Sequence, residues 1–302
     1  MGYLHGFTLC KQRIIAFLAQ RPFYCYRALS NPQNLYISIV KHIAKITIST
    51  RGGSSFPFTL PVFKKPFTLD FAKPVVIIAG DNGCGKSTLL EAIAYKLNLP
   101  TIGSTSTLTD STFDPSRELF DHVNIYWRNK THNGMFFRAE DYIGFVRSIQ
   151  MLKSGLGNEL KEMEEYLRGQ GLVLVQGLLK GQVNELESRY NGNLEEKSHG
   201  EGFLQILSSR IHGNGVYVLD EPEASLSPMK QLSMISLLMQ SASNTDAQFI
   251  IATHSPVLMG IPNSTIYYLN ENGIEEMAYE DTEHYQIYKS FLDNRERFLR
   301  YL

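Results

Sequence analysis

The sequence predicts an α/β fold built on a parallel sheet. Three short runs, at 74–79, 215–219 and 248–252, are rich in β-branched and other apolar residues and lack polar alternation. Such runs are typical of strands that are buried on both faces. The first run leads through a glycine-rich loop into a helical pattern over 89–94, and the other two end in polar residues. Ligands of open parallel sheets bind at the carboxyl ends of the strands, so a site is expected there.

The composition is that of a folded globular chain. Of its 302 residues, 43% are hydrophobic, and the formal net charge is −1. That charge balance excludes a protein whose whole surface is basic for nucleic-acid binding, although a local basic patch is compatible with it. No apolar run approaches the roughly 18 residues of a membrane helix. The three cysteines show no metal-ligand spacing, and their odd number argues against a secreted disulfide framework. We expect a soluble, cytoplasmic protein without a transmembrane segment.

The first part of the chain is basic and aromatic, and no acidic residue precedes Asp70. Residues 1–34 are expected to form a basic extension, because an alternating pattern at 36–39 and another at 46–48 predict strands from about residue 35 onward. A basic, aromatic arm could bind phosphates, membrane headgroups or an acidic partner. The alternative is a poorly ordered extension, or packed strands that lack acids. A signal peptide fits poorly, since the apolar stretch is short and no cleavage site follows.

Residues 80–88 carry the pattern G-x-x-x-x-G-K-[ST] between a predicted strand and a predicted helix, which identifies a phosphate-binding P-loop. Its glycines let the backbone wrap closely around phosphates with the N–H groups turned inward. Lys86 is expected to reach the β- and γ-phosphates, and Ser87 to offer its hydroxyl to Mg²⁺. For Cys84, beside a helix N-terminus, we expect a lowered thiol pKa. The nucleotide-binding residues expected here are Gly80, Asn82, Gly83, Cys84, Gly85, Lys86, Ser87 and Thr88.

Two further polar strand ends complete the expected site. The strand at 216–219 ends in Asp220 and Glu221, and His254 follows the strand at 248–252. Asp220 suits the magnesium shell, and Glu221 suits the orientation or deprotonation of an attacking water. The alternative for the two carboxylates is a polar strand cap or turn. The alternative for the histidine is an ordinary core or surface residue.

These motifs resemble those of ATP-binding-cassette (ABC) ATPases. In chain order they are Walker A at 80–88, Walker B with its glutamate at 216–221, a D-loop-like segment at 224–227, and the switch histidine His254. At the place of the signature loop, residues 197–202 depart from the transporter form L-S-G-G-Q. They resemble small soluble AAA/ABC-type ATPases related to chromosome-maintenance and recombination ATPases, as do 135–140 and 294–299.

The resemblance covers residues 35–302. It implies an ABC-ATPase-like core with a mixed, largely parallel sheet flanked by helices, an antiparallel β-subdomain and a helical subdomain. It also implies ATP and Mg²⁺ as cofactors. The signature residues Ser198 and Gly200 would contact the γ-phosphate held by the opposite subunit of a head-to-tail, ATP-dependent homodimer. Ser198 and Glu201 also match a capping box, which is compatible with phosphate binding.

The segment between the P-loop and the signature loop yields three further expectations. Residues 123–138 read as a β-hairpin with a two-residue turn at Asn133 and Gly134. Residues 141–197 form a helical subdomain insert that is far too short for long coiled-coil arms. By position, Glu140 would take the metal-sensing role of the family's Q-loop, whereas an ordinary surface glutamate is the alternative.

The resemblance implies a soluble ABC-type ATPase whose ATP-driven dimerisation drives or licenses an unidentified protein partner, with DNA repair or defence as candidate settings. The alternative is the nucleotide-binding subunit of an ABC membrane transporter. The altered signature loop and the absence of an unambiguous Q-loop glutamine argue against that alternative. A protein with a dead site is disfavoured because Lys86, Asp220, Glu221 and His254 are all present.

Overall fold

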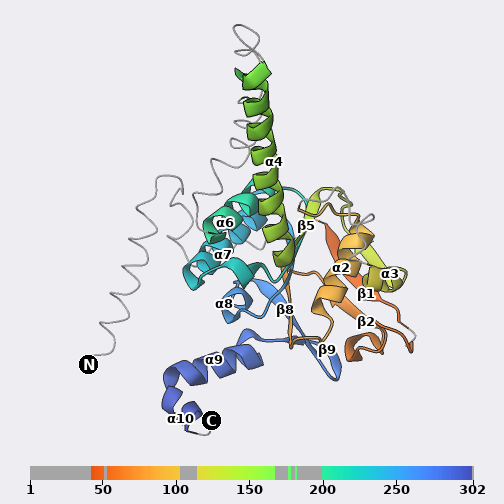
Figure 1. Cartoon of the computed structure of the whole chain (residues 1–302). Coiled ribbons are helices and arrows are strands. Elements are labelled where there is room, and N and C mark those ends of the chain that lie inside the picture. Colours follow the sequence, from red (N-terminus) through yellow and green to blue (C-terminus); the bar gives the residue numbers. More distant parts are fainter. Residues whose placement is uncertain are drawn as a thin grey trace. The chain divides into compact units, whose positions relative to one another are not determined.

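A computed structural model describes residues 42–50, 53–102, 114–166, 176–177, 181, 199–211 and 213–300 (Figure 1). The chain divides into two compact units, residues 1–37 and 38–302. The first unit lies outside the described residues, and so does the strand expected at 36–39. The elements described below all belong to the second unit.

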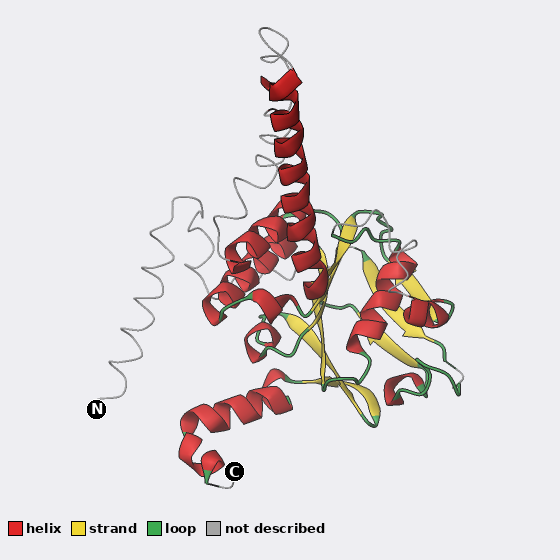
Figure 2. Ribbon diagram, viewed as in Figure 1, coloured by secondary structure: helices red, strands yellow, loops and turns green. Residues whose placement is uncertain are grey.

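A six-stranded sheet has the order β5-β6-β7-β3-β8-β9. Figure 2 shows the strands in yellow with helices around them. Its strands are β3 (Val75–Gly80), β5 (Gly134–Arg138), β6 (Val216–Asp220), β7 (Gln248–Ala252), β8 (Ser264–Asn270) and β9 (Gly273–Met277). The first five strands in that order run parallel, and β9 pairs with β8 antiparallel. The prediction of a mixed, largely parallel sheet is confirmed, and the three buried runs are β3, β6 and β7.

A smaller antiparallel sheet has the order β2-β1-β4. It consists of β1 (Ile43–Ile48), β2 (Phe67–Asp70) and β4 (Val123–Trp127). The alternation expected at 46–48 falls within β1, and the expected antiparallel β-subdomain is confirmed.

Helices cover both faces of the large sheet. The helices among the described residues are α2 (Lys86–Leu97), α3 (Asp114–Phe120), α4 (Ala139–Tyr166), α6 (His199–Arg210), α7 (Pro228–Asn244), α8 (Pro256–Met259), α9 (Glu283–Asp293) and α10 (Arg295–Leu299). Short 3₁₀ turns are η1 (Pro61–Phe63), η4 (Pro222–Ser225) and η5 (Tyr279–Asp281). Ile77 packs in a core with Phe203 of α6 and Leu238 of α7, whereas Ile78 packs in a second core with α2 and the small sheet. Burial on both faces explains the lack of polar alternation.

The predicted hairpin over 123–138 is wrong. β4 lies in the small sheet and β5 lies at the edge of the large one, so the two strands do not pair. The burial pattern gives the reason: β4 alternates between buried and more exposed residues, whereas Met135 to Arg138 are all buried. Gly134 is no turn residue either. It belongs to β5, where a Cβ would lie 1.8 Å from the carbonyl oxygen of Val216.

The helical insert expected at 141–197 begins two residues earlier, because α4 starts directly after β5 at Ala139. Helix α4 continues to Tyr166, and most of 167–198 lies outside the described residues. Among the residues that the structure describes, no helix combines the length and the apolar composition needed to cross a membrane.

Candidate nucleotide site

The three polar strand ends meet at one edge of the large sheet. β7 lies between β3 and β6, and Ala252 at its end pairs with Ile78 on one side and Asp220 on the other. The loop after β3, the carboxylates after β6 and the histidine after β7 therefore share the carboxyl edge. This is where ligands of open parallel sheets bind.

The loop between β3 and α2 depends on glycine at its two ends. Gly80 has φ 139° and lies so close to β8 that a Cβ would be 2.3 Å from the carbonyl oxygen of Leu269. Gly85, with φ 104°, is the left-handed residue directly before α2. Both conformations disfavour residues with a Cβ. The loop therefore delivers the N-terminus of α2, with its free N–H groups and partial positive charge, to the sheet edge.

Lys86 lies at the start of α2 and is almost completely buried. Its ammonium donates hydrogen bonds to the carbonyl oxygens of Gly80 (3.0 Å) and Asp81 (2.8 Å). Burial lowers the pKa of Lys86, and the neighbouring charges of Cys84, Glu221 and Asp220 partly oppose that shift. The lysine is thus folded back over the loop, within reach of an anion placed inside it. Of the other expected loop residues, Asn82 is exposed and Ser87 and Thr88 are half-buried.

Asp220 is buried, and its carboxylate accepts a hydrogen bond from the Ser87 side chain. Burial is the main cause that raises its pKa to about 7, and the bond from Ser87 works against the rise. Its Oδ1 is buried without a hydrogen-bond partner among the described residues. A hydroxyl beside a carboxylate with a free oxygen fits Mg²⁺, which takes few protein oxygens and completes its shell with phosphate and water. No group of three or more His, Cys, Asp or Glu residues forms a metal cage within the described part of the chain.

Glu221 and His254 face one another across the neighbouring strand ends. Glu221 has φ 46°, and its backbone N–H donates to the carbonyl oxygen of Ala252 at 3.0 Å. Its side chain is 44% exposed, and Oε1 lies 3.5 Å from Nε2 of His254. Burial and the charge of Lys86 lower the pKa of His254. The site therefore contains a solvent-accessible carboxylate beside an imidazole that is neutral at neutral pH.

Glu223 is a supporting residue that sequence reasoning missed. It lies in η4 and is mostly buried, and its Oε1 accepts bonds from Thr253 Oγ1 (2.6 Å), the His254 N–H (2.7 Å) and the Ser255 N–H (3.1 Å). Burial raises its pKa, and the hydrogen bonds from Thr253 and His254 oppose the rise. The carboxylate ties the segment after Walker B to the loop that carries His254. Its place directly before the D-loop-like segment is the only signal in the sequence.

Arg138 is a second missed residue, and it determines the surroundings of Glu140. It ends β5 opposite Asp220 and is buried in contact with Asp141 (2.8 Å), Glu140 (3.3 Å) and Glu91 (3.5 Å). The side chain of Glu140 is 72% exposed. It therefore lies in an ion pair at the rim of the site, one strand away from Asp220.

The expectation for Cys84 is wrong in direction. Its thiol is half-buried, and burial raises its pKa; Lys86 lowers it, but by less. Proximity to a helix N-terminus does not compensate for the loss of solvent at this position.

The structure describes only part of the signature loop. Ser198 lies outside the described residues, so neither its trans contact nor its capping role is visible. Gly200 is buried in the first turn of α6, where a Cβ would be 3.2 Å from the carbonyl oxygen of Ser225. Glu201 forms an ion pair with Lys230 at 2.8 Å. The signature segment thus packs against the D-loop-like turn η4.

Two family profiles match the motif-bearing parts of the chain. Residues 55–132, which hold the P-loop, match a family described as "AAA domain". Residues 186–260, which hold the signature loop, Walker B and His254, match one described as "AAA domain, putative AbiEii toxin, Type IV TA system".

Several individual proteins resemble this chain at low sequence identity. A tRNA dimethylallyltransferase of Chlorobium chlorochromatii (strain CaD3) is 26% identical in an alignment of 220 positions that covers 68% of this chain and 68% of that protein. Among solved structures, the Smc head domain of Pyrococcus furiosus bound to the C-terminal domain of ScpA is 13% identical with a TM-score of 0.42, covering 84% of this chain and 100% of that one. A nucleotide-free ATP-binding cassette of an ABC transporter is 17% identical with a TM-score of 0.44, covering 85% and 98%. Nothing about this chain's activity follows from these similarities.

The fold and the two AAA-domain matches agree with the sequence motifs. A P-loop lies between β3 and α2, a pair of carboxylates ends β6, and a histidine follows β7 at the same sheet edge. Two parts of the chain thus match AAA-domain families, and they carry the P-loop and the strand ends that form this site.

Proposed function

We propose that the chain binds ATP with Mg²⁺ at this sheet edge and hydrolyses it. The observation that carries the proposal is the convergence of a buried lysine, a buried carboxylate with a free oxygen and an accessible carboxylate beside a neutral histidine. An anion site, a cation site and a water-orienting group are the three elements that phosphate hydrolysis needs.

Each group has a distinct proposed role. Lys86 and the N–H groups at the start of α2 hold the β- and γ-phosphates, with Gly80, Asn82, Gly83, Cys84, Gly85 and Thr88 shaping the loop. Ser87 and Asp220 hold Mg²⁺, which neutralises charge on the phosphates when bound. Glu221 orients the attacking water and accepts its proton. His254 donates a hydrogen bond toward the γ-phosphate.

Measurements of nucleotide binding with and without the metal distinguish the proposed roles of Lys86 and Asp220. A fluorescent ATP analogue titrated with and without Mg²⁺ should bind the wild type more tightly when Mg²⁺ is present. Asp220→Asn should lose that Mg²⁺ dependence but keep metal-free binding, whereas Lys86→Ala should lose binding under both conditions. Asp121→Asn, an exposed aspartate, is the matched control. Metal dependence that survives in Asp220→Asn would place the cation elsewhere, and Glu140 is then the next candidate.

We further propose that ATP joins two copies head to tail, with Ser198 and Gly200 of one chain completing the site of the other. The early position of Gly200 in α6, a potential anion-binding helix terminus, supports this arrangement. Such a dimer would drive or license a protein partner in the cytoplasm, with DNA as a candidate substrate. A transporter subunit remains the alternative, and binding to a membrane-embedded partner would support it.

Light scattering tests the dimer. Glu221→Gln should be dimeric with Mg·ATP and monomeric without it, because a ligand shifts an equilibrium only by its differential affinity for the two states. Adding Ser198→Arg should restore the monomer and leave ATP binding at the P-loop intact. A double variant that still dimerises with ATP would place the interface elsewhere. Transfer of a dimethylallyl group to tRNA without ATP hydrolysis would replace the proposal altogether.

A further inference from the structure

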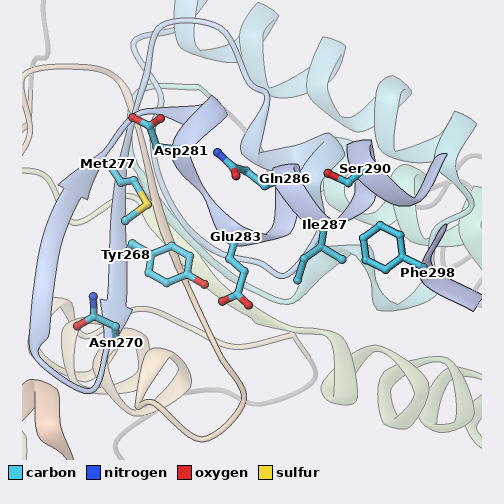
Figure 3. A pocket seen from close by; sticks show the side chains of 9 residues that line it. All are labelled: Tyr268, Asn270, Met277, Asp281, Glu283, Gln286, Ile287, Ser290 and Phe298. Carbon is cyan, nitrogen blue, oxygen red and sulfur yellow. The ribbon is translucent and has the colours of Figure 1, made fainter. Parts of the chain in front are cut away.

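A second histidine touches His254 from a distant part of the chain. His284 lies in the first turn of α9, and its Nε2 is 3.3 Å from Nδ1 of His254. The two ring centroids are 5.5 Å apart, and the ring of Tyr268 on β8 is 6.2 Å from that of His284. Glu283, the neighbour of His284, points toward Tyr268 in Figure 3.

The first turn of α9 is fixed on both sides of this contact. Thr282 is buried and caps the helix by accepting the Tyr285 N–H. The hydroxyl of Tyr279 donates to the carbonyl oxygen of Pro256 at 2.9 Å, two residues after His254. Further along, α9 borders a hollow of about 600 Å³ lined by residues that include Met277, Ile287 and Phe298 (Figure 3). His284 thus brings the start of α9 into contact with the site.

Both imidazoles are in their neutral form at neutral pH. Burial lowers the pKa of His284, as it does that of His254, and Lys86 adds to the effect in each case. One ring must then donate and the other accept, since a neutral imidazole has one N–H and one lone pair.

The surroundings distinguish the two possible arrangements of protons. If His254 donated through Nδ1, its Nε2 lone pair would face the Glu221 carboxylate at 3.5 Å. His284 would then accept through Nε2 and carry its own proton on Nδ1, which is buried without an acceptor among the described residues. If His284 donates through Nε2, then Nε2–H of His254 lies 3.5 Å from the carboxylate oxygen without forming a hydrogen bond, and His284 Nδ1 is an unused acceptor. Each arrangement leaves one buried imidazole N–H without a hydrogen bond among the described residues. Only the second places that N–H beside the negative carboxylate of Glu221, where the first places a lone pair, so the second is electrostatically favoured.

We propose that His284 is a positioning residue that donates its Nε2–H to Nδ1 of His254 and so keeps the proton of His254 on Nε2, facing Glu221 and the γ-phosphate position. The proposal makes the start of α9 part of the ATPase site. Its catalytic consequence rests on the proposed function, whereas the proton arrangement does not.

Nuclear magnetic resonance tests the proton arrangement without any turnover. Two-bond ¹H–¹⁵N correlation spectra of the nucleotide-free full chain distinguish the ring tautomers, and His254→Gln assigns the His254 signals by their loss. We expect His254 with its proton on Nε2 in the wild type and in His284→Gln, whose side-chain amide can still donate. In His284→Leu we expect a mixture. A wild-type His254 protonated on Nδ1, or an unchanged tautomer in His284→Leu, would overturn the proposal.

Kinetics then test the consequence. His284→Leu should lower kcat about 5-fold, the effect expected for one lost hydrogen bond, with little change in the KM for ATP. His284→Gln should recover most of the rate, and His132→Leu, which removes an exposed histidine elsewhere, should match the wild type. Wild-type kcat in His284→Leu would refute the positioning role. A wild type without ATPase activity would refute the proposed function instead, and the spectra would still decide the tautomer.

Discussion

Replacing Asp220 by asparagine should stabilise the nucleotide-free protein in a pH-dependent manner. Burial raises the pKa of this carboxyl from its ordinary value of 3.8 to about 7. The ionised form is therefore less favourable in the folded than in the unfolded chain, and stability is lost as the pH rises between those two values. At 1.36 kcal/mol for each pKa unit, the full cost is about 4 kcal/mol above pH 7. Asparagine avoids it and can still accept the bond from Ser87.

Thermal unfolding over a series of pH values measures the effect. At pH 8, Asp220→Asn should raise the Tm on the order of 10 °C, since 1 kcal/mol corresponds to about 2–4 °C in a chain of this size. Near pH 4 the two proteins should unfold together. Asp121→Asn, which replaces an exposed aspartate, is the matched control. Parallel pH profiles for wild type and Asp220→Asn would refute the argument that the carboxylate is destabilised by burial.

Three further changes test the surroundings of the site. Gly80→Ala should destabilise the fold by about 2 kcal/mol or more, because its Cβ would collide with the carbonyl oxygen of Leu269. Gly83→Ala places its Cβ in open space and should cost only about 1 kcal/mol. Chemical denaturation of the two variants measures the difference in their free energies of unfolding. Glu223→Ala removes the acceptor of three hydrogen bonds and should lower kcat about 10-fold, with a smaller change in KM. A wild-type kcat in this variant would contradict the supporting role of Glu223. Alkylation of Cys84, followed by mass spectrometry, should be slow at pH 7, accelerate as the pH rises and be blocked by bound ATP; fast alkylation at pH 7 would contradict the raised pKa.

The parts of the fold that the sequence predicted are those with a strong local signal. Strands β3, β6 and β7 are buried on both faces, so each reads as a continuous apolar run. Which strands pair with one another has no comparable local signal in the sequence. β4 and β5 are neighbours in sequence and both apolar, yet they belong to different sheets: β4 alternates in burial, whereas Met135 to Arg138 of β5 are all buried.

In the site, too, some residues have a local signal in the sequence and others are placed only by tertiary contacts. The P-loop, Asp220, Glu221 and His254 are recognisable because their chemistry requires fixed spacing or a strand end. Glu223 and His284 act on the loop and ring of His254 through tertiary contacts across about thirty residues of sequence. Spacing along the chain gives no signal for contacts of that kind. The raised pKa of the Cys84 thiol likewise depends on burial by surrounding elements.

Single-turnover hydrolysis of Mg·ATP tests the central claim most directly. With enzyme in excess over γ-labelled ATP, the wild type should release phosphate in one exponential phase. Glu221→Gln should bind ATP as tightly but release phosphate at least about 100-fold more slowly, since general-base catalysis contributes about 10²–10⁴-fold. Wild-type phosphate release by Glu221→Gln, or equal loss of ATP affinity in Glu221→Gln and Lys86→Ala, would contradict the account.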